Sequence, residues 1–235
     1  GTDTSSGAFI VRTVNAGTAG VSGELSFTSG TTSSGTSGAI TVATGRATNG
    51  KSGNMVLSVS AGNTYDGGDI EVKAGETTAA STRGGTISIT AGTATATTAA
   101  EGGSMLVHGG RGHSFTGGSI SLSTGEGTIM SSGGLVLRTV NAGTSGVSGA
   151  LSFTSGTASS GGSGSISLFT GAATHGEGGD ILVSVGKSKT DTGGDIYVIA
   201  GDSTPFTGGA VSLTTGEGTD TSSGAFIVRT VNAGT

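Results

Sequence analysis

A short unit that recurs fifteen times sets the strongest limit on how this chain can fold. Each unit begins with a glycine, carries large apolar residues at the second and fourth positions after it, and ends in a stretch of polar or small residues. Most units are 15 residues long, and the others are one to three residues longer. Strict alternation of apolar and polar residues with many β-branched side chains is typical of a half-buried strand. We therefore expect one strand per unit.

The glycine at the beginning of each unit is called the start glycine below. The start glycines are Gly7, Gly23, Gly38, Gly53, Gly68, Gly85, Gly103, Gly118, Gly133, Gly149, Gly164, Gly179, Gly194, Gly209 and Gly224. Both apolar positions are filled in every unit, from Phe9 and Val11 to Phe226 and Val228. We expect the glycines that bracket each strand to supply the positive-φ positions of tight turns.

A longer repeat lies over the short one. Residues 1–18 return letter for letter as residues 218–235, which gives a period of 217 residues. Within this period, residues 131–157 resemble residues 5–31 at an offset of 126, and 91 residues remain. We expect residues 1–235 to form a single continuous repeat array, with one period in 1–217 and the start of the next in 218–235. An array of this kind favours an architectural role over catalysis.

Odd and even units differ at the positions between and after the two apolar residues. Most even units carry serine or threonine there: Ser26, Thr28, Ser88, Thr90, Ser121, Ser123, Ser152, Thr154, Ser212 and Thr214. Most odd units carry large or charged residues instead: Ile10, Arg12, Leu106, His108, Val136, Arg138, Phe169, Tyr197 and Ile199. This alternation indicates two consecutive strands in different environments.

Two all-β architectures satisfy the alternation. The favoured one is a β-solenoid with two strands per coil of ~30 residues and two parallel sheets, which would rise roughly 34 Å per period. The other is an antiparallel meander or sandwich of strand-turn units of ~15 residues. The solenoid is favoured because a single sheet leaves one face of the apolar core uncovered.

Composition indicates an extracellular structural protein. Glycine makes up 50 of the 235 residues, charged residues 11% and aromatic residues 4%, and cysteine is absent. Collagen is excluded because the chain has one proline and no three-residue glycine period. The net charge of −5 argues against nucleic-acid binding, and no apolar run is long enough to span a membrane.

Three local motifs suggest chemistry and are better explained otherwise. Residues 45–52 fit a phosphate-binding loop, but another strand pattern follows where a helix is needed. His108 and His113 have no nearby carboxylate in their unit to complete a metal site. Acidic turns such as 124–128 resemble calcium-binding β-rolls without completing their nonapeptide. We predict no catalytic, cofactor-binding or metal-binding residues, no cofactor, and no enzymatic activity.

Two faces are candidates for binding. We predict that the nine large or charged residues of the odd units form a lateral interface with further copies. A surface row with this many large apolar side chains is unfavourable in contact with water and indicates a binding surface. The serines and threonines of the even units form a flat hydroxyl face, which is either a plain solvated face of good strand formers or a surface suited to carbohydrate, mineral or ice. The main prediction is therefore a self-associating extracellular filament, fibre or stalk, and the alternative is an adhesin that uses the hydroxyl face.

Segments such as GGDIYVIAG (193–201) and SGALSFTSG (148–156) carry a family resemblance. In pattern, the whole chain resembles the tandem-repeat β-solenoid regions of large secreted adhesins and surface-filament proteins. The resemblance implies extracellular exposure and a mechanical or adhesive role, and it transfers no functional residue to this chain.

Overall fold

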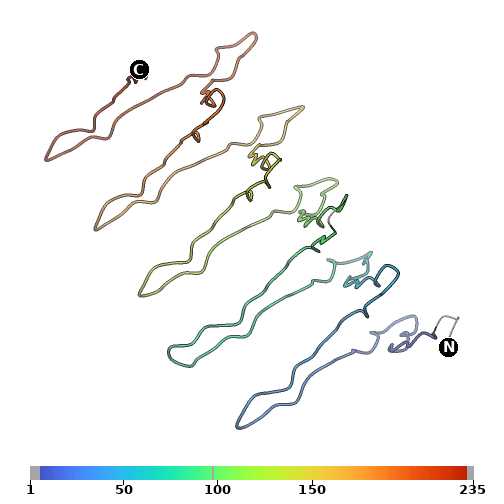
Figure 1. The fold of residues 1–235 in the computed structure, drawn as a ribbon. Coiled ribbons are helices and arrows are strands. Elements are labelled where there is room, and N and C mark those ends of the chain that lie inside the picture. The colour runs from blue at the N-terminus through green and yellow to red at the C-terminus, as the bar shows by residue number, and fades with distance from the viewer. Residues whose placement is uncertain (1–5, 97, 232–235) are drawn as a thin grey trace. The chain divides into compact units, whose positions relative to one another are not determined.

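The computed structural model describes residues 6–96 and 98–231, which contain no helix and no strand. The chain divides into an N-terminal unit, Gly1–Ile120, and a C-terminal unit, Ser121–Thr235. In each unit, extended arms alternate with reversals of the chain (Figure 1). Here an arm is the stretch from a start glycine to the sixth residue after it, and a turn is the stretch from there to the next start glycine.

The reversals keep the spacing of the sequence unit. Bends lie at 18–20, 33–35, 48–50 and 63–65 in the first part of the N-terminal unit and at 159–161, 174–176, 189–191 and 204–206 in the C-terminal unit. Each bend falls between two arms, so the chain runs out along one arm and back along the next. Consecutive turns therefore lie at opposite ends of the arm that joins them (Figure 1).

The predicted β-solenoid and its antiparallel alternative are both wrong for the described residues. A strand requires a ladder of backbone hydrogen bonds to a neighbouring strand. The arms have the predicted alternation, but they have no such ladder, because the backbone hydrogen bonds between described residues run only across the turns. The apolar pattern is therefore present without the sheet that it was expected to build.

The predicted apolar core is also absent, since no described side chain is buried. The accessible surface is 23870 Å² for a chain of 22.1 kDa. A compact domain of this mass exposes about 9,000 Å², and a fully extended chain about 32,000 Å². This chain therefore removes only about a quarter of its extended surface from solvent, against about 70% for a compact domain.

The start glycine lies close to the end of the preceding arm at the base of each turn, which we call the neck. At every turn, a Cβ atom added to the next start glycine would lie 2.9 to 3.8 Å from an atom of the sixth or seventh residue after the preceding start glycine. The sixth residue, the neck residue, is always small or β-branched, as in Thr13, Val59, Ala74 and Gly109. At six necks the distance is under 3.4 Å, closer than ordinary van der Waals contact, and at the other eight it is an ordinary contact.

Six of the necks contain a backbone hydrogen bond. In each, the start glycine donates its N–H to the carbonyl of the glycine that follows the preceding neck residue, over 2.8 to 3.1 Å. The pairs are Gly85–Gly75, Gly103–Gly92, Gly118–Gly110, Gly133–Gly125, Gly209–Gly201 and Gly224–Gly216. The necks also contain four of the few described residues that are partly shielded from solvent: Thr13, Ala74, Ala91 and Ala200.

The start glycines therefore do not have the role that the sequence predicts. Among the described residues, positive φ occurs at the last residue of individual bends, as at Gly35 (112°), Gly161 (108°), Gly176 (123°) and Ser81 (59°). At six start glycines an added Cβ atom would stand less than 3.4 Å from the facing arm, which is closer than ordinary van der Waals contact: Gly68, Gly85, Gly103, Gly118, Gly194 and Gly209. At these six positions close approach, and not left-handed backbone, explains the glycine.

The neck at Gly85 provides a direct test. A Cβ on Gly85 would lie 3.1 Å from the Gly75 nitrogen, whereas a Cβ on Gly75 would meet nothing within 4 Å. We expect Gly85→Ala to weaken the bond and to speed hydrogen exchange of the residue-85 amide about fivefold, the equivalent of about 1 kcal/mol. Gly75→Ala is the matched control and should change this rate less than twofold. Equal effects of the two substitutions would contradict the steric explanation.

Urea unfolding of the dilute, unassociated chain tests the absence of a core. The dependence of the unfolding free energy on urea concentration scales with the surface newly exposed. We expect a value about one-third of that of a compact domain of equal length, because the chain removes so little surface from solvent. A value typical of compact domains would show that the single chain has a core.

Candidate functional site

The residues of the predicted lateral interface lie on extended arms and are all exposed. Ile10, Arg12, Leu106 and His108 belong to the N-terminal unit. Val136, Arg138, Phe169, Tyr197 and Ile199 belong to the C-terminal unit. Within each unit these residues come from odd arms only.

Exposure alone does not distinguish this row, because almost every described residue is exposed. The extent of exposure does distinguish the two sides of an arm. From Leu25 to Val211, the first apolar residue of each arm is 48% to 63% exposed. The apolar residues that point the other way, such as Leu106 and Tyr197, are 73% to 85% exposed. The second apolar residue of these arms, on the same side as the first, is 53% to 76% exposed, so the two sides differ in degree. The predicted interface lies on the more exposed side, which we call the open side.

A side-chain hydrogen bond orders part of the open side in the C-terminal unit. The Tyr197 hydroxyl donates to Asp195 Oδ2 over 2.8 Å. The two residues are two positions apart on an extended arm, so both side chains leave it on the same side. The bond gives the phenol a partner within its own arm, which lowers the cost of covering the ring with another molecule.

The predicted hydroxyl face is fully open to solvent. All ten of its serines and threonines, from Ser26 and Thr28 to Ser212 and Thr214, are exposed. They lie on even arms in both units, without a sheet beneath them to hold them flat. The structure therefore presents these hydroxyls separately on each arm.

A pocket of about 310 Å³ lies beside one residue of the predicted interface. Its lining comes from four consecutive residues, Arg138, Thr139, Val140 and Asn141, in the arm and turn of the ninth unit. Ligand pockets are normally enclosed by several segments with convergent polar groups. This one is a surface depression along a single stretch of chain.

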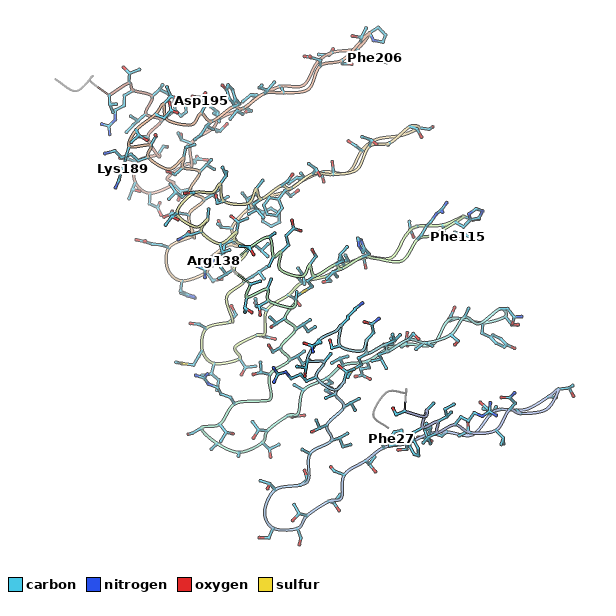
Figure 2. All side chains as sticks on the ribbon, turned by 45° about the vertical axis from the view of Figure 1, so that its right-hand side comes forward. Phe27, Phe115, Arg138, Lys189, Asp195 and Phe206 are labelled. Carbon is cyan, nitrogen blue, oxygen red and sulfur yellow. The ribbon has the colours of Figure 1, made fainter. Side chains whose placement is uncertain are left out.

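Sequence reasoning missed the apolar residues at the turns. Phe115 and Phe206 lie far out on two turns (Figure 2) and are 91% and 82% exposed. They are 91 residues apart, in the similar segments SFTGG and PFTGG. A comparison of segments 91 residues apart, the length of the second sub-repeat, could have found these two phenylalanines. The consensus unit describes all turns as polar or small and therefore hides them.

The described residues contain no group of three or more metal-ligating side chains. They also contain no helix with the length and hydropathy that a membrane crossing requires. Comparisons of the chain with family models, curated proteins and solved structures give no match. The function of this protein is therefore inferred from the chain's own residues.

Fluorescence anisotropy can test the bond between Tyr197 and Asp195. The chain has two tyrosines and no tryptophan, so the Tyr65→Phe variant reports on Tyr197 alone. In this variant, we expect Asp195→Ala to lower the anisotropy, because a net hydrogen bond of about 1 kcal/mol no longer restrains the ring. The control is Asp66→Ala in the Tyr197→Phe variant, where Tyr65 should keep its anisotropy. No change on removal of Asp195 would mean that the bond does not form in solution.

Proposed function

We propose that this protein is a non-enzymatic structural protein that self-associates into an extracellular filament, fibre or stalk. The proposal concerns association between copies and requires no sheet within a single chain. Its partners are further copies, present as tandem repeats in one chain or as separate chains.

The observation that carries the proposal is the exposure of regularly spaced apolar side chains along both units. Soluble monomers rarely expose contiguous apolar surface beyond a few hundred Å². Here the apolar residues of every described arm are open to solvent, including Ile87 and Ile89 at 48% and 72%. Covering one such side chain fully contributes about 1.5–3 kcal/mol, so a few arms provide the driving force for an interface.

The repeat explains why copies are the proposed partner. The same open side recurs at fixed offsets, as in Val136 and Arg138, which lie 126 residues after Ile10 and Arg12. A partner with the same spacing can meet many of these positions in register, and every contact then adds to the total. A stable interface buries about 1,600 Å² in total, a small share of the 23870 Å² that this chain exposes.

Composition supports the extracellular and non-enzymatic parts of the proposal. The chain is rich in glycine, contains no cysteine, and has 11% charged residues. Catalytic sites depend on convergent titratable groups in a concave pocket. The pocket beside Arg138 is lined by one continuous stretch and offers no such convergence.

The exposed hydroxyl face supports a second candidate, an adhesin that binds carbohydrate or another surface. Its ten hydroxyl residues are all accessible on the even arms. The two functions differ in solution. A monomeric chain that binds polysaccharide through Ser88, Thr90 and their equivalents would support the adhesin, whereas concentration-dependent assembly in the absence of any ligand supports the structural protein.

Sedimentation velocity over a concentration series tests the structural proposal. We expect the triple variant Leu106→Ser, Val136→Ser and Tyr197→Ser to weaken self-association at least tenfold, because it removes apolar side chains from the open side of odd arms. The matched control is Val56→Ser with Leu182→Ser, which removes similarly exposed side chains, 80% and 85%, from even arms. Unchanged assembly in the triple variant would contradict the proposed interface, and a wild-type chain that stays monomeric would contradict self-association.

A further inference from the structure

The alternation of turns separates charge in the N-terminal unit. Turns that lead from an odd arm to an even arm lie at one end of the arms, and turns that lead from an even arm to an odd arm lie at the other (Figure 1). We call the first the basic end and the second the acidic end. Each end consists of its turns together with the first two and last two arm residues next to them.

All the lysines and arginines of the N-terminal unit fall at the basic end: Arg12, Arg46, Lys51, Lys73, Arg83 and Arg111. Two carboxylates, Glu24 and Glu76, lie there as well, which leaves a net charge of +4. His108 and His113 also belong to this end. The described part of the acidic end has Asp66, Asp69 and Glu101 and no basic residue, a net charge of −3.

The C-terminal unit shows how far apart the two ends lie. Figure 2 places Lys189 and Phe206 at opposite ends of the arm that begins at Gly194. An extended arm of seven residues spans roughly 20 Å. At 0.01 M salt the Debye length is about 30 Å, so charges attract over a distance of this size, and the basic end of one copy can attract the acidic end of another before they touch.

From this separation we infer that the basic end of the N-terminal unit docks on the acidic end of a second copy of this chain. The inference rests on the proposed function, because it names the geometry of the same self-association. Charge complementarity supports a second copy as the partner, since the copy carries the matching −3 end. The even-to-odd end of the C-terminal unit also has a net charge of −3, and the second charge-swap variant below distinguishes the two. The contact is head to tail, so it leaves one basic and one acidic end free and can extend through many copies.

The exposed turns suit such a contact. The basic end also carries Phe115, and the acidic end carries Tyr65 beside Asp66, each 91% exposed. Arginine and lysine attract the faces of aromatic rings when water is excluded. A docked pair of ends can therefore cover two apolar side chains that the single chain leaves in solvent.

A charge-swap experiment tests the inference. The first variant carries Arg46→Glu, Lys51→Glu, Arg83→Glu and Arg111→Glu, which makes both ends acidic. The second carries Asp66→Lys, Asp69→Lys and Glu101→Lys, which makes both ends basic. In 10 mM salt, we expect each variant alone to associate at least tenfold more weakly than the wild type, and an equimolar mixture to recover association to within threefold of it.

Salt and a conservative variant provide the controls. Wild-type association should fall at least tenfold between 10 mM and 1 M salt, where the Debye length is about 3 Å. Arg46→Lys with Arg83→Lys and Arg111→Lys keeps the charge and should associate as the wild type does. Because these side chains are exposed and no core depends on them, recovery in the mixture also shows that both variants retain their structure.

Three results would overturn end-to-end docking. Association that survives 1 M salt and both charge reversals would reject it while leaving apolar self-association intact. A chain that stays monomeric under all conditions would reject both. Tight binding of polyglutamate to a chain that does not bind copies of itself would assign the basic end to a foreign polyanion.

Discussion

The close approach of each start glycine to the end of the preceding arm is the constraint on which the rest of this structure depends. A start glycine lies so near the end of the preceding arm that an added Cβ would stand 2.9 to 3.8 Å from it. At six of the fourteen necks the distance is under 3.4 Å, so a side chain there would force its neighbour to shift, and the facing neck residue is small or β-branched at every neck. This contact fixes which residues face each other across the base of every turn.

Sequence reasoning predicted the parts of the structure that are local. The alternation at Ile87 and Ile89 identifies an extended arm with two unlike sides, and the spacing of the start glycines predicts where bends fall. The predicted solenoid failed because a ladder and a core are nonlocal: alternation says which way a side chain points, and not which segment lies opposite it. The role of the start glycines was misjudged for a related reason. Positive φ and close approach both demand glycine, and a sequence alone does not tell Gly35, with its φ of 112°, from Gly85, which faces another backbone.

The candidate surfaces were predictable to different degrees. The odd and even rows follow from position within the unit, so Leu106 and Tyr197 could be assigned to one side of an arm without a structure. The turn residues Phe115 and Phe206 break the unit pattern and emerge only when segments 91 residues apart are compared. The charge separation was hidden for a different reason. A net charge of −5 sums both ends, and the separation becomes visible only when each turn is assigned to an end.

The two attractive terms act over different distances and therefore do different things in association. Apolar contact contributes only when side chains touch and water leaves. Charge attraction extends over tens of ångströms at low salt and orients two molecules before they meet. The charge term is also uneven along the chain. In the C-terminal unit the end with odd-to-even turns has only Arg138 and Arg229 against Glu177, Asp180 and Asp202, a net charge of −1. The strong basic end belongs to the N-terminal unit alone, so each copy has one basic end for head-to-tail docking. The apolar rows recur in both units and can stabilise the contact after docking.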